Sequence, residues 1–338
     1  MKTQAYHKFW HNLHDKAKDR GLPLRVLFEL TYGCNFKCRH CYVPQSYKRK
    51  ILQELKTGNV ISMLEQLADS GCFHLGFSGG EPFIRKDALK ILKYAKRKGF
   101  NIIIYTNGSL INEKIAGELQ QLNPNKVDIT IPSLKQGVFE RITGIKGSYA
   151  KVFRAIELLD KNKIALGFKT CLLKENETEI AAIEKFAASL NAEHRLDDRL
   201  SRRLNGSDEP FKYRAYPKVY TGGYYPVHEK TTPRLFTCGA GKTQAAITPF
   251  GELKICTLID YPKYKISESS FESCWDKLKT LVKSIGVDEY YKCAGCSLSP
   301  YCKWCPAVSW LYDRTFTSCD PQIRKWAKIK KQNYGKRN

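Results

Sequence analysis

The sequence predicts an α/β protein: a partial (β/α)6 TIM-type barrel followed by a small cysteine-rich domain. Between residues 25 and 190, short apolar or β-branched runs alternate with amphipathic helical patterns. Such alternation is typical of parallel strands that are covered by helices. After a stretch rich in Gly, Pro and Tyr at about 205–235, the chain becomes cysteine-rich and its apolar runs become short. That stretch predicts a loop or linker between two domains.

Each strand and helix is placed by its pattern. Strands are expected at residues 26–30, 74–79, 101–107, 127–131 and 165–173, with a sixth near 194–200. Helices are expected between them at 59–71, 87–99, 111–122, 149–162 and 177–190. Several of these helical patterns end in Gly or Asn, which helix C-termini favour. We therefore expect an N-terminal helical extension at 1–24, the barrel at 25–220 and the cysteine-rich domain at 221–338.

The composition bounds the class of protein. A chain of 338 residues is long enough for a barrel and a smaller domain. It contains no run of about 18 apolar residues and no signal-peptide pattern, so we expect a cytoplasmic protein that does not enter a membrane. Its 13 cysteines then favour metal binding over disulfides, because reducing compartments keep thiols free.

The net charge is +24, and much of it lies in basic runs at 48–50, 93–98 and 324–337. Such runs either form a soluble basic surface or bind an acidic partner. Nucleic acid is one such partner, but no helix-turn-helix, RRM or zinc-finger pattern accompanies the runs. An acidic peptide or protein fits equally well, and charge alone does not choose among these partners.

Three cysteines with the spacing C-x3-C-x2-C follow the first predicted strand: Cys34, Cys38 and Cys41. Three thiolates on one loop can hold three irons of a cubane cluster and leave the fourth iron open to a substrate or cofactor. The alternative is a zinc knuckle or a set of structural cysteines. Zinc prefers four closed ligands, often as paired C-x2-C units, so ligand counting favours the open cluster.

Glycines and polar residues follow the next strands, at the edge where chemistry gathers in a (β/α) barrel. The second strand is followed by Gly79, Gly80, Glu81 and Pro82. Glycine there lets the backbone approach a ligand closely, and proline fixes the turn. The third and fourth strands end in further hydroxyl and amide side chains: Thr106, Asn107, Thr130 and Ser133. An ordinary strand–helix turn is the alternative explanation for each of these segments.

The C-terminal third holds a second cysteine pattern. Cys238 and Cys256 fit the spacing C-x12-G-x4-C around Gly251. The rest of the pattern is C-x2-C-x5-C-x2-C-x13-C, formed by Cys293, Cys296, Cys302, Cys305 and Cys319. A zinc ribbon made of the first four of these five is the alternative. It leaves Cys238, Cys256 and Cys319 unexplained.

The first cysteine loop, with the aromatic Tyr42 after its third cysteine, resembles the signature of radical S-adenosylmethionine (SAM) enzymes. In that family the open iron of a [4Fe-4S] cluster binds the methionine moiety of SAM, and an electron from the cluster releases a 5′-deoxyadenosyl radical. The resemblance implies that residues 79–82 form the motif for the methionine amino group and that Thr106 and Asn107 belong to the family's TNG motif. Thr130 stands where relatives carry a serine that faces ribose or carboxylate, with Ser133 nearby.

The C-terminal pattern resembles a SPASM extension, which in relatives holds two auxiliary iron–sulfur clusters; the x2 before Cys305 departs from the usual x3. The resemblance implies one auxiliary cluster closed by four thiolates, those of Cys293, Cys296, Cys302 and Cys319. The other would have only three, from Cys238, Cys256 and Cys305. Its fourth ligand would be Cys274, a substrate thiolate or solvent. Cys274 lies in an amphipathic helical pattern, where packing is its ordinary role.

Two cysteines lie outside both patterns. Cys72 follows a helix and is expected to be a small core residue. Cys171 lies near the end of a predicted barrel strand, where it could face the cavity. Because some radical epimerases return a hydrogen atom from a cysteine, Cys171 is a candidate hydrogen donor, with burial as a small hydrophobe as the alternative.

The resemblance implies a peptide maturase. Relatives with a SPASM extension mostly modify ribosomally made peptides by thioether, carbon–carbon or epimerising chemistry. The partners implied are a precursor peptide of acidic character and an electron donor such as flavodoxin or ferredoxin. Residues 1–24 are too short for the leader-binding domain that many maturases carry. Recognition of the peptide would therefore use the barrel mouth, the extension or a separate leader-binding protein.

Two other functions stay open. One is an enzyme that resembles the anaerobic sulfatase maturases or oxidises a small molecule. The other is a non-catalytic iron–sulfur or RNA-binding module that kept the fold; it predicts no SAM cleavage and RNA binding that weakens steeply with salt. The intact cysteine loop together with residues 79–82 favours the enzyme.

Overall fold

The computed structural model describes residue 12 and residues 15–215 and 235–334. Its centre is a curved sheet in the order β6-β5-β4-β3-β2-β1-β7-β8-β9. Six parallel strands run in sequence order: β1 (Arg25–Thr31), β2 (His74–Gly79), β3 (Asn101–Thr106), β4 (Lys126–Thr130), β5 (Leu166–Cys171) and β6 (Glu193–Asp197). Because β6 and β9 are the two edges, the sheet stays open. This confirms the partial barrel.

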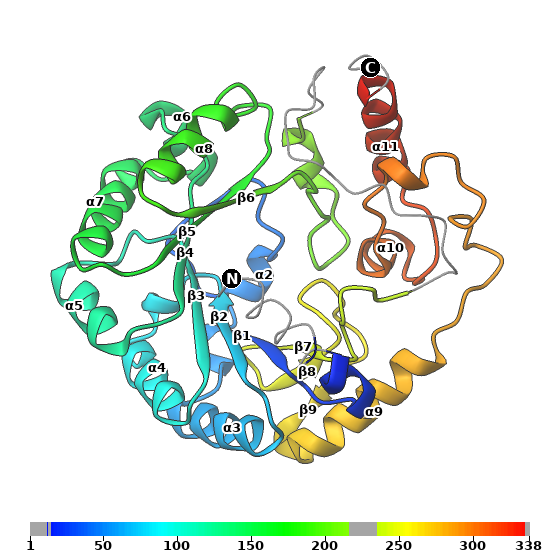
Figure 1. The fold of residues 1–338 in the computed structure, drawn as a ribbon, viewed down its shortest axis with the longest axis horizontal. Helices are drawn as coiled ribbons and strands as arrows, with labels where there is room; N and C mark the ends of the chain where they lie inside the picture. Colours follow the sequence, from blue (N-terminus) through cyan, green and yellow to red (C-terminus); the bar gives the residue numbers. More distant parts are fainter. Residues whose placement is uncertain (1–11, 13–14, 216–234, 335–338) are drawn as a thin grey trace.

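Helices connect the parallel strands and surround the sheet, as Figure 1 shows. They are α2 (Gln45–Lys48), α3 (Thr57–Asp69), α4 (Ala88–Arg97), α5 (Glu113–Leu122), α6 (Gln136–Thr143), α7 (Ser148–Lys161) and α8 (Ile180–Ser189). Five of these lie within a few residues of their predicted positions, which is the usual scatter of helix ends. The sequence did not predict α6, because eight residues give too few turns for a clear periodicity.

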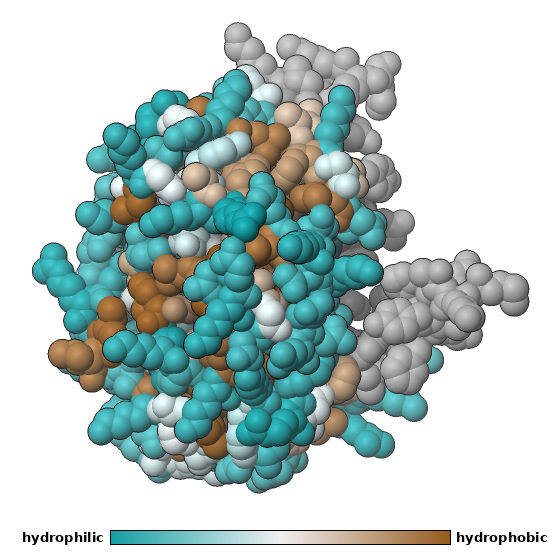
Figure 2. Space-filling view, turned by 90° about the vertical axis from the view of Figure 1, so that its left-hand side faces the viewer, coloured by the Kyte–Doolittle hydropathy of each residue, from teal (hydrophilic) through white to brown (hydrophobic). Residues whose placement is uncertain are grey.

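Strand residues alternate between the helix-covered face and the barrel interior. On β4, Val127 and Ile129 are fully buried in the main hydrophobic core. The alternate residues Lys126 and Asp128 instead form an ion pair, 3.6 Å from Nζ to Oδ2. The interior face is therefore polar, and it is the face toward which the strand-end loops can present chemistry. Figure 2 shows the opposite, helix-covered outside, where hydrophilic side chains dominate and hydrophobic ones appear between them.

The cysteine-rich region continues the same sheet. Strand β7 (Gln244–Ile247) pairs in parallel with β1, and β8 (Glu252–Lys254) and β9 (Tyr264–Lys265) follow as antiparallel neighbours. Three helices complete it: α9 (Phe271–Ser284), α10 (Pro306–Asp313) and α11 (Pro321–Tyr334). The expected boundary at 220/221 and most of the expected linker lie outside the described residues, so the division into domains stays a prediction.

Buried ion pairs join the end of the barrel to the last helix. The carboxylate of Asp198, directly after β6, contacts Nζ of Lys303 at 2.8 Å and Nζ of Lys330 in α11 at 2.9 Å. Arg202 is also paired with the fully buried Asp320. These contacts fix the cysteine-bearing segment between Lys303 and α11 against the barrel edge. None of the described helices is long and apolar enough to cross a membrane.

Candidate functional site

The three cysteines of the first loop are brought together after β1. The turn begins where Gly33 N donates to Thr31 Oγ1 at 2.9 Å, and it is tightened where Cys41 N donates to the carbonyl of Cys38 at 3.2 Å. Burial, and then the charges of the Cys41 and Cys34 thiolates, raise the pKa of Cys38. Burial raises the pKa of Cys34 as well, and the charge of the Cys41 thiolate raises it further. Buried neighbouring thiolates that repel one another need a cation.

The number of thiols on this loop favours a cluster over a single ion. A cubane spreads its thiolate ligands over several irons, whereas structural zinc draws four ligands to one point. Within residues 15–215 and 235–334, no three His, Cys, Asp or Glu side chains are already placed as ligands of one metal ion. The open iron–sulfur cluster on Cys34, Cys38 and Cys41 therefore stays a prediction from the number and spacing of these thiols.

The glycine pair after β2 packs against the backbone of the cysteine loop. Gly79 has φ +120°, and a Cβ there would lie 2.1 Å from the carbonyl oxygen of Thr31. A Cβ on Gly80 would lie 2.1 Å from the carbonyl oxygen of Gly33. The close approach that the sequence predicts at this pair is thus made to the turn before Cys34. Pro82 is buried at the start of the following short helix. Contact of this segment with SAM stays a prediction.

Glu81 ties β2 to the end of β3. Its fully buried carboxylate accepts hydrogen bonds from Thr106 Oγ1 at 2.8 Å and from Asn107 N at 2.7 Å. Burial raises the pKa of Glu81 to about 7, although these hydrogen bonds oppose the shift. Asn107 Nδ2 in turn donates to Asn35 Oδ1 at 2.9 Å and lies 3.9 Å from the Cys34 Sγ. Thr106 and Asn107 therefore lie beside the cysteine loop and brace it.

Tyr42 faces a buried ion pair. Its phenol donates to Glu29 on β1 at 2.7 Å, and Tyr32 donates to the same carboxylate at 3.0 Å. Nζ of Lys254 on β8 lies 3.0 Å from Glu29, and the two side chains are only 1% and 0% exposed. Sequence reasoning missed this pair. The signal was a glutamate inside the apolar run of β1, where a charge must find a partner.

The two hydroxyls after β4 are placed differently. Thr130 ends β4 and is half-buried, in register with Lys169 of β5. Ser133 is fully buried, and its hydroxyl donates to the carboxylate of Glu179 at 2.8 Å. Glu179 also accepts a hydrogen bond from Leu134 N at 3.0 Å. The hydroxyl of Ser133 thus shapes the turn after β4, while Thr130 stands at the barrel mouth.

Cys171 lies near the first cysteine loop, at the end of β5. Burial raises the pKa of its thiol to about 11, opposed by the charge of Lys169 and increased by Asp197 and Cys41. Nζ of Lys169 forms an ion pair with Asp197 at 3.1 Å. Burial, and then the charge of Lys169, lower the pKa of His40 to about 4. The structure therefore brings a neutral thiol, an ion pair and a neutral imidazole to one part of the barrel mouth.

The C-terminal cysteines form two separate groups. Burial and then the charges of Cys302, Cys319 and Cys296 raise the pKa of Cys293 to about 12. In the second group, burial and then Cys305 raise the pKa of Cys256 to about 12, and the charge of Cys238 acts on Cys305. Mutual repulsion of this kind acts only between near neighbours. The four-plus-three division is the one that the resemblance to the SPASM extension implied.

The two other cysteines lie in the core. The thiol of Cys274 is buried in α9 and lies 3.6 Å from the carbonyl oxygen of Lys265. Its pKa is raised by burial, and no other cysteine contributes to the shift. Cys72 is buried and lies 3.6 Å from the carbonyl oxygen of His74. Both positions suit packing.

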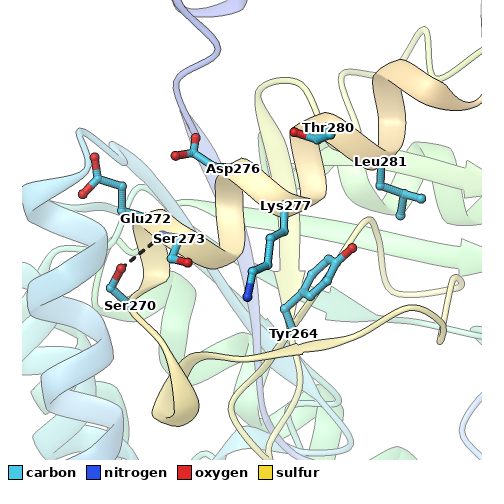
Figure 3. Close-up of a pocket in the computed structure, with 8 residues that line it drawn as sticks. All are labelled: Tyr264, Ser270, Glu272, Ser273, Asp276, Lys277, Thr280 and Leu281. Atoms are coloured by element: carbon cyan, nitrogen blue, oxygen red, sulfur yellow. Dashed lines mark hydrogen bonds between the residues drawn. The ribbon is translucent and has the colours of Figure 1, made fainter.

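Two pockets lie in the part of the molecule that includes the sheet's β8–β9 end. One, of about 690 Å³, runs along α9, with Lys277 and Tyr264 directed toward it (Figure 3). No cysteine is among its described lining residues. The other, of about 440 Å³, lies beside the first cysteine loop. Its walls include Tyr32, Tyr47 and Lys254.

Comparison with known proteins finds relatives in sequence. Residues 28–187 match the Radical SAM superfamily. The subtilosin biosynthesis protein AlbA of Bacillus subtilis is 27% identical over 75% of this chain and 60% of its own length. The PqqA peptide cyclase of Gluconobacter oxydans is 29% identical over 50% of this chain and 47% of its own length. The chain thus spans about half of these curated relatives. The mycofactocin maturase MftC of Mycolicibacterium smegmatis is 24% identical over 91% of this chain and 85% of its own.

Two solved structures share the fold. Streptococcus suis SuiB bound to S-adenosylmethionine superimposes with a TM-score of 0.67 at 15% identity, over 90% of this chain and 78% of its own. The protein anSMEcpe with bound AdoMet gives a TM-score of 0.63 at 16% identity, over 93% of this chain and 94% of its own. These likenesses confirm the fold that the sequence predicts.

Proposed function

We propose that this chain, whose residues 28–187 match the Radical SAM superfamily, abstracts a hydrogen atom from an unactivated carbon of a ribosomally made peptide. One observation carries the proposal: a three-cysteine loop, braced by the ends of β2 and β3, accompanies two further cysteine groups. AlbA, MftC and the PqqA peptide cyclase support a peptide substrate, and one SuiB structure holds the precursor peptide SuiA.

Cys34, Cys38 and Cys41 would hold a [4Fe-4S] cluster with one open iron. With SAM bound, such a cluster supplies a 5′-deoxyadenosyl radical, and the hard chemistry belongs to the cofactor. The chain's own residues position it. Glu81 and Asn107 fix the loop, and the proposed SAM contacts are Gly79–Pro82, Thr106 and Thr130, with Tyr42 held by Glu29. Ser133 would act on this site through the turn that Glu179 stabilises.

The C-terminal groups would hold two auxiliary clusters, which we propose are also [4Fe-4S]. Cys293, Cys296, Cys302 and Cys319 supply four thiolates to one of them. Cys238, Cys256 and Cys305 supply three to the other. Because the Cys274 thiol faces a backbone carbonyl, the fourth ligand would be a substrate thiolate or solvent. Iron atoms held in this way can accept electrons when a peptide is oxidised.

Two reaction outcomes fit the site. An oxidised carbon radical forms a thioether or carbon–carbon cross-link, with the auxiliary clusters as electron acceptors. A carbon radical quenched by a hydrogen atom gives an epimerised residue, and Cys171 would be the donor. The protonated thiol of Cys171, next to the first cysteine loop, supports the second outcome.

The test is a mass spectrum of a short peptide encoded beside this gene, after anaerobic reaction in heavy water with reconstituted protein, SAM and dithionite. A loss of about two mass units means cross-linking, and a gain of about one from solvent deuterium means epimerisation. An unchanged peptide despite 5′-deoxyadenosine release points to a protein or small-molecule substrate. The matched control replaces Cys34, Cys38 and Cys41 by Ala. Residual 5′-deoxyadenosine formation in that variant would contradict the proposal, and none in the wild type would favour a non-catalytic module.

A further inference from the structure

We infer that a basic surface beside the first cysteine loop docks an acidic one-electron carrier protein. This surface, called here the loop-side surface, consists of Arg49, Lys50, Ile51, Leu52, Lys263 and Lys265. The inference rests on the proposed function, because only a redox-active cysteine loop needs a carrier.

The loop-side surface has an apolar tip directly above the cysteine loop. Ile51 lies over Gly33, since a Cβ on that glycine would be 2.8 Å from Ile51 Cδ1. The next residue, Leu52, is 100% exposed. A single exposed leucine is ordinary on a protein surface, but this one closely follows the exposed Arg49 and Lys50 in the chain. A small apolar centre with a charged rim is typical of protein docking sites.

Two of the four cations of this surface lack an ion-pair partner among the described residues. Arg49 and Lys50 are exposed and form no ion pair within the described part of the chain; Nζ of Lys50 lies 6.0 Å from the centroid of the Tyr47 ring. Lys263 and Lys265 line the 440 Å³ pocket together with Lys50. These two lysines form ion pairs with Glu252 and Glu268, at 3.2 and 2.9 Å. An acidic partner would supply the charge that Arg49 and Lys50 lack.

The position of the surface favours an electron carrier. The ring of Tyr47 lies 5.7 Å from that of Tyr32, two residues before Cys34. Lys254 lines the same pocket and lies two residues before Cys256. The surface therefore adjoins both the first cysteine loop and one auxiliary group. Electron transfer slows steeply with distance, and carrier complexes are small, transient and steered by charge.

The precursor peptide is the other acidic partner to weigh. A peptide must bring a carbon atom to the barrel mouth, where Cys171 and Lys169 lie on β5. The residues of the loop-side surface come instead from the segment after the cysteine loop and from β9 and the turn before it, and β9 is the edge of the sheet opposite to β6. In the step proposed here, a reduced flavin or iron–sulfur carrier loses one electron, and the metal site on Cys34, Cys38 and Cys41 gains it.

The experiment compares two reductants of the same site. Initial rates of 5′-deoxyadenosine formation are measured with dithionite and with a bacterial flavodoxin kept reduced by its NADPH-dependent reductase. In the variant Arg49→Glu/Lys50→Glu, we expect the flavodoxin-driven rate to fall about tenfold and the dithionite-driven rate to stay within about twofold. Leu52→Ser is expected to lower only the flavodoxin-driven rate.

The matched control places the same charge change elsewhere. Lys96→Glu/Arg97→Glu on α4 should leave both rates unchanged. A similar fall in this control would show that net charge alone matters, and an equal loss with both reductants would show damage to the cysteine site. Unchanged flavodoxin rates in the loop-side variants, with a raised KM for the peptide, would assign the surface to the peptide. Each of these results would overturn the inference.

Binding separates this inference from the proposed function. Oxidised flavodoxin binds without turnover, and its flavin fluorescence reports the Kd at low and high salt. Tight binding at low salt that weakens in Arg49→Glu/Lys50→Glu supports the surface even where no SAM is cleaved, and only the proposed function then fails. Equal affinity of wild type and variant would contradict the surface.

Discussion

The phenol of Tyr42 donates a 2.7 Å hydrogen bond to the carboxylate of Glu29. Tyr42, which follows Cys41, is thereby bound to β1, the strand that precedes Cys34. The same carboxylate pairs with Lys254, which lies two residues before Cys256. The buried Glu29 therefore links the first cysteine loop to the segment that carries Cys256. The two regions can keep a fixed relative position because β1 and β7 belong to one sheet.

Removing the charge of Lys254 should lower the free energy of unfolding. Lys254→Met leaves the Glu29 carboxylate buried without its charge partner, and breaking a buried pair in this way costs about 3–5 kcal/mol. The double variant Glu29→Gln/Lys254→Met should regain part of that loss, because it leaves no uncompensated charge. Denaturant unfolding of the wild type, the single variants and the double variant measures this as a coupling energy.

The exposed pair Lys265–Glu268 provides the comparison. Both side chains are more than half exposed, so Lys265→Met should change the free energy of unfolding far less than Lys254→Met does. Equal effects of Lys254→Met and Lys265→Met would contradict the importance of burial at Glu29.

The three cysteine groups should be independent in metal content. Replacing Cys34, Cys38 and Cys41 by Ala should remove about four irons per chain and leave the auxiliary irons in place. Replacing Cys293, Cys296, Cys302 and Cys319 should remove a different set of about four. Cys274→Ala and Cys72→Ala should leave the iron content unchanged, because both thiols contact backbone carbonyls in the core. Iron and sulfide assays after anaerobic reconstitution measure each variant. Loss of iron in Cys274→Ala would restore that residue as the fourth ligand.

The ion pairs after β6 should make stability depend on pH. Burial alone would raise the pKa of Asp198, but the charges of Lys330 and Lys303 outweigh it and lower the pKa to about 2. The pKa of Lys303 is itself lowered, to about 8, because burial outweighs the attraction of Asp198. Lys303 therefore stays largely charged at neutral pH.

The sign of the pH effect follows from the lowered pKa of Asp198. A carboxyl whose folded pKa lies below its unfolded value of 3.8 stabilises the fold above that pH and loses this contribution as the pH falls toward 2. Asp198→Asn should thus be less stable than the wild type by about 2 kcal/mol near neutral pH, and the gap should narrow below pH 4. Denaturant unfolding across this range measures it. A gap that stays constant with pH would show that the Asp198 carboxylate is not coupled to these lysines.

The sequence predicts most of the fold because strand and helix periodicities are local. Val127 and Ile129, for example, alternate with polar residues in the printed order of the chain. The sequence does not predict the helix at Gln136–Thr143, because its pattern is too short. It does not predict β7 to β9 either, because strands of two to four residues carry little pattern. The division of the C-terminal cysteines followed only from a family resemblance, since spacing alone also allows a zinc ribbon.

The features that the sequence does not predict are mostly contacts between residues far apart in the chain. Nothing local to Glu29 indicates Lys254, and nothing local to Ser133 indicates that its hydroxyl is bound by Glu179. The sequence places Gly79 and Gly80 at a ligand, whereas the contact that the structure gives them is with the backbone of the cysteine loop. Such partners are fixed by tertiary packing, which overrides what a short motif can predict.

The packing of Gly80 predicts a cluster defect from a single methyl group. In Gly80→Ala the new Cβ would lie 2.1 Å from the carbonyl oxygen of Gly33, a backbone atom that can give way only if the cysteine loop moves. Gly117→Ala is the matched control, because a Cβ there meets nothing within 4 Å and lies inside α5. Alanine in a helix interior should stabilise the fold by about 0.5–1 kcal/mol. After reconstitution, Gly80→Ala should therefore lose iron from the first loop and form little 5′-deoxyadenosine, while Gly117→Ala keeps both. Full iron content in Gly80→Ala would show that the contact between Gly80 and Gly33 does not hold the loop.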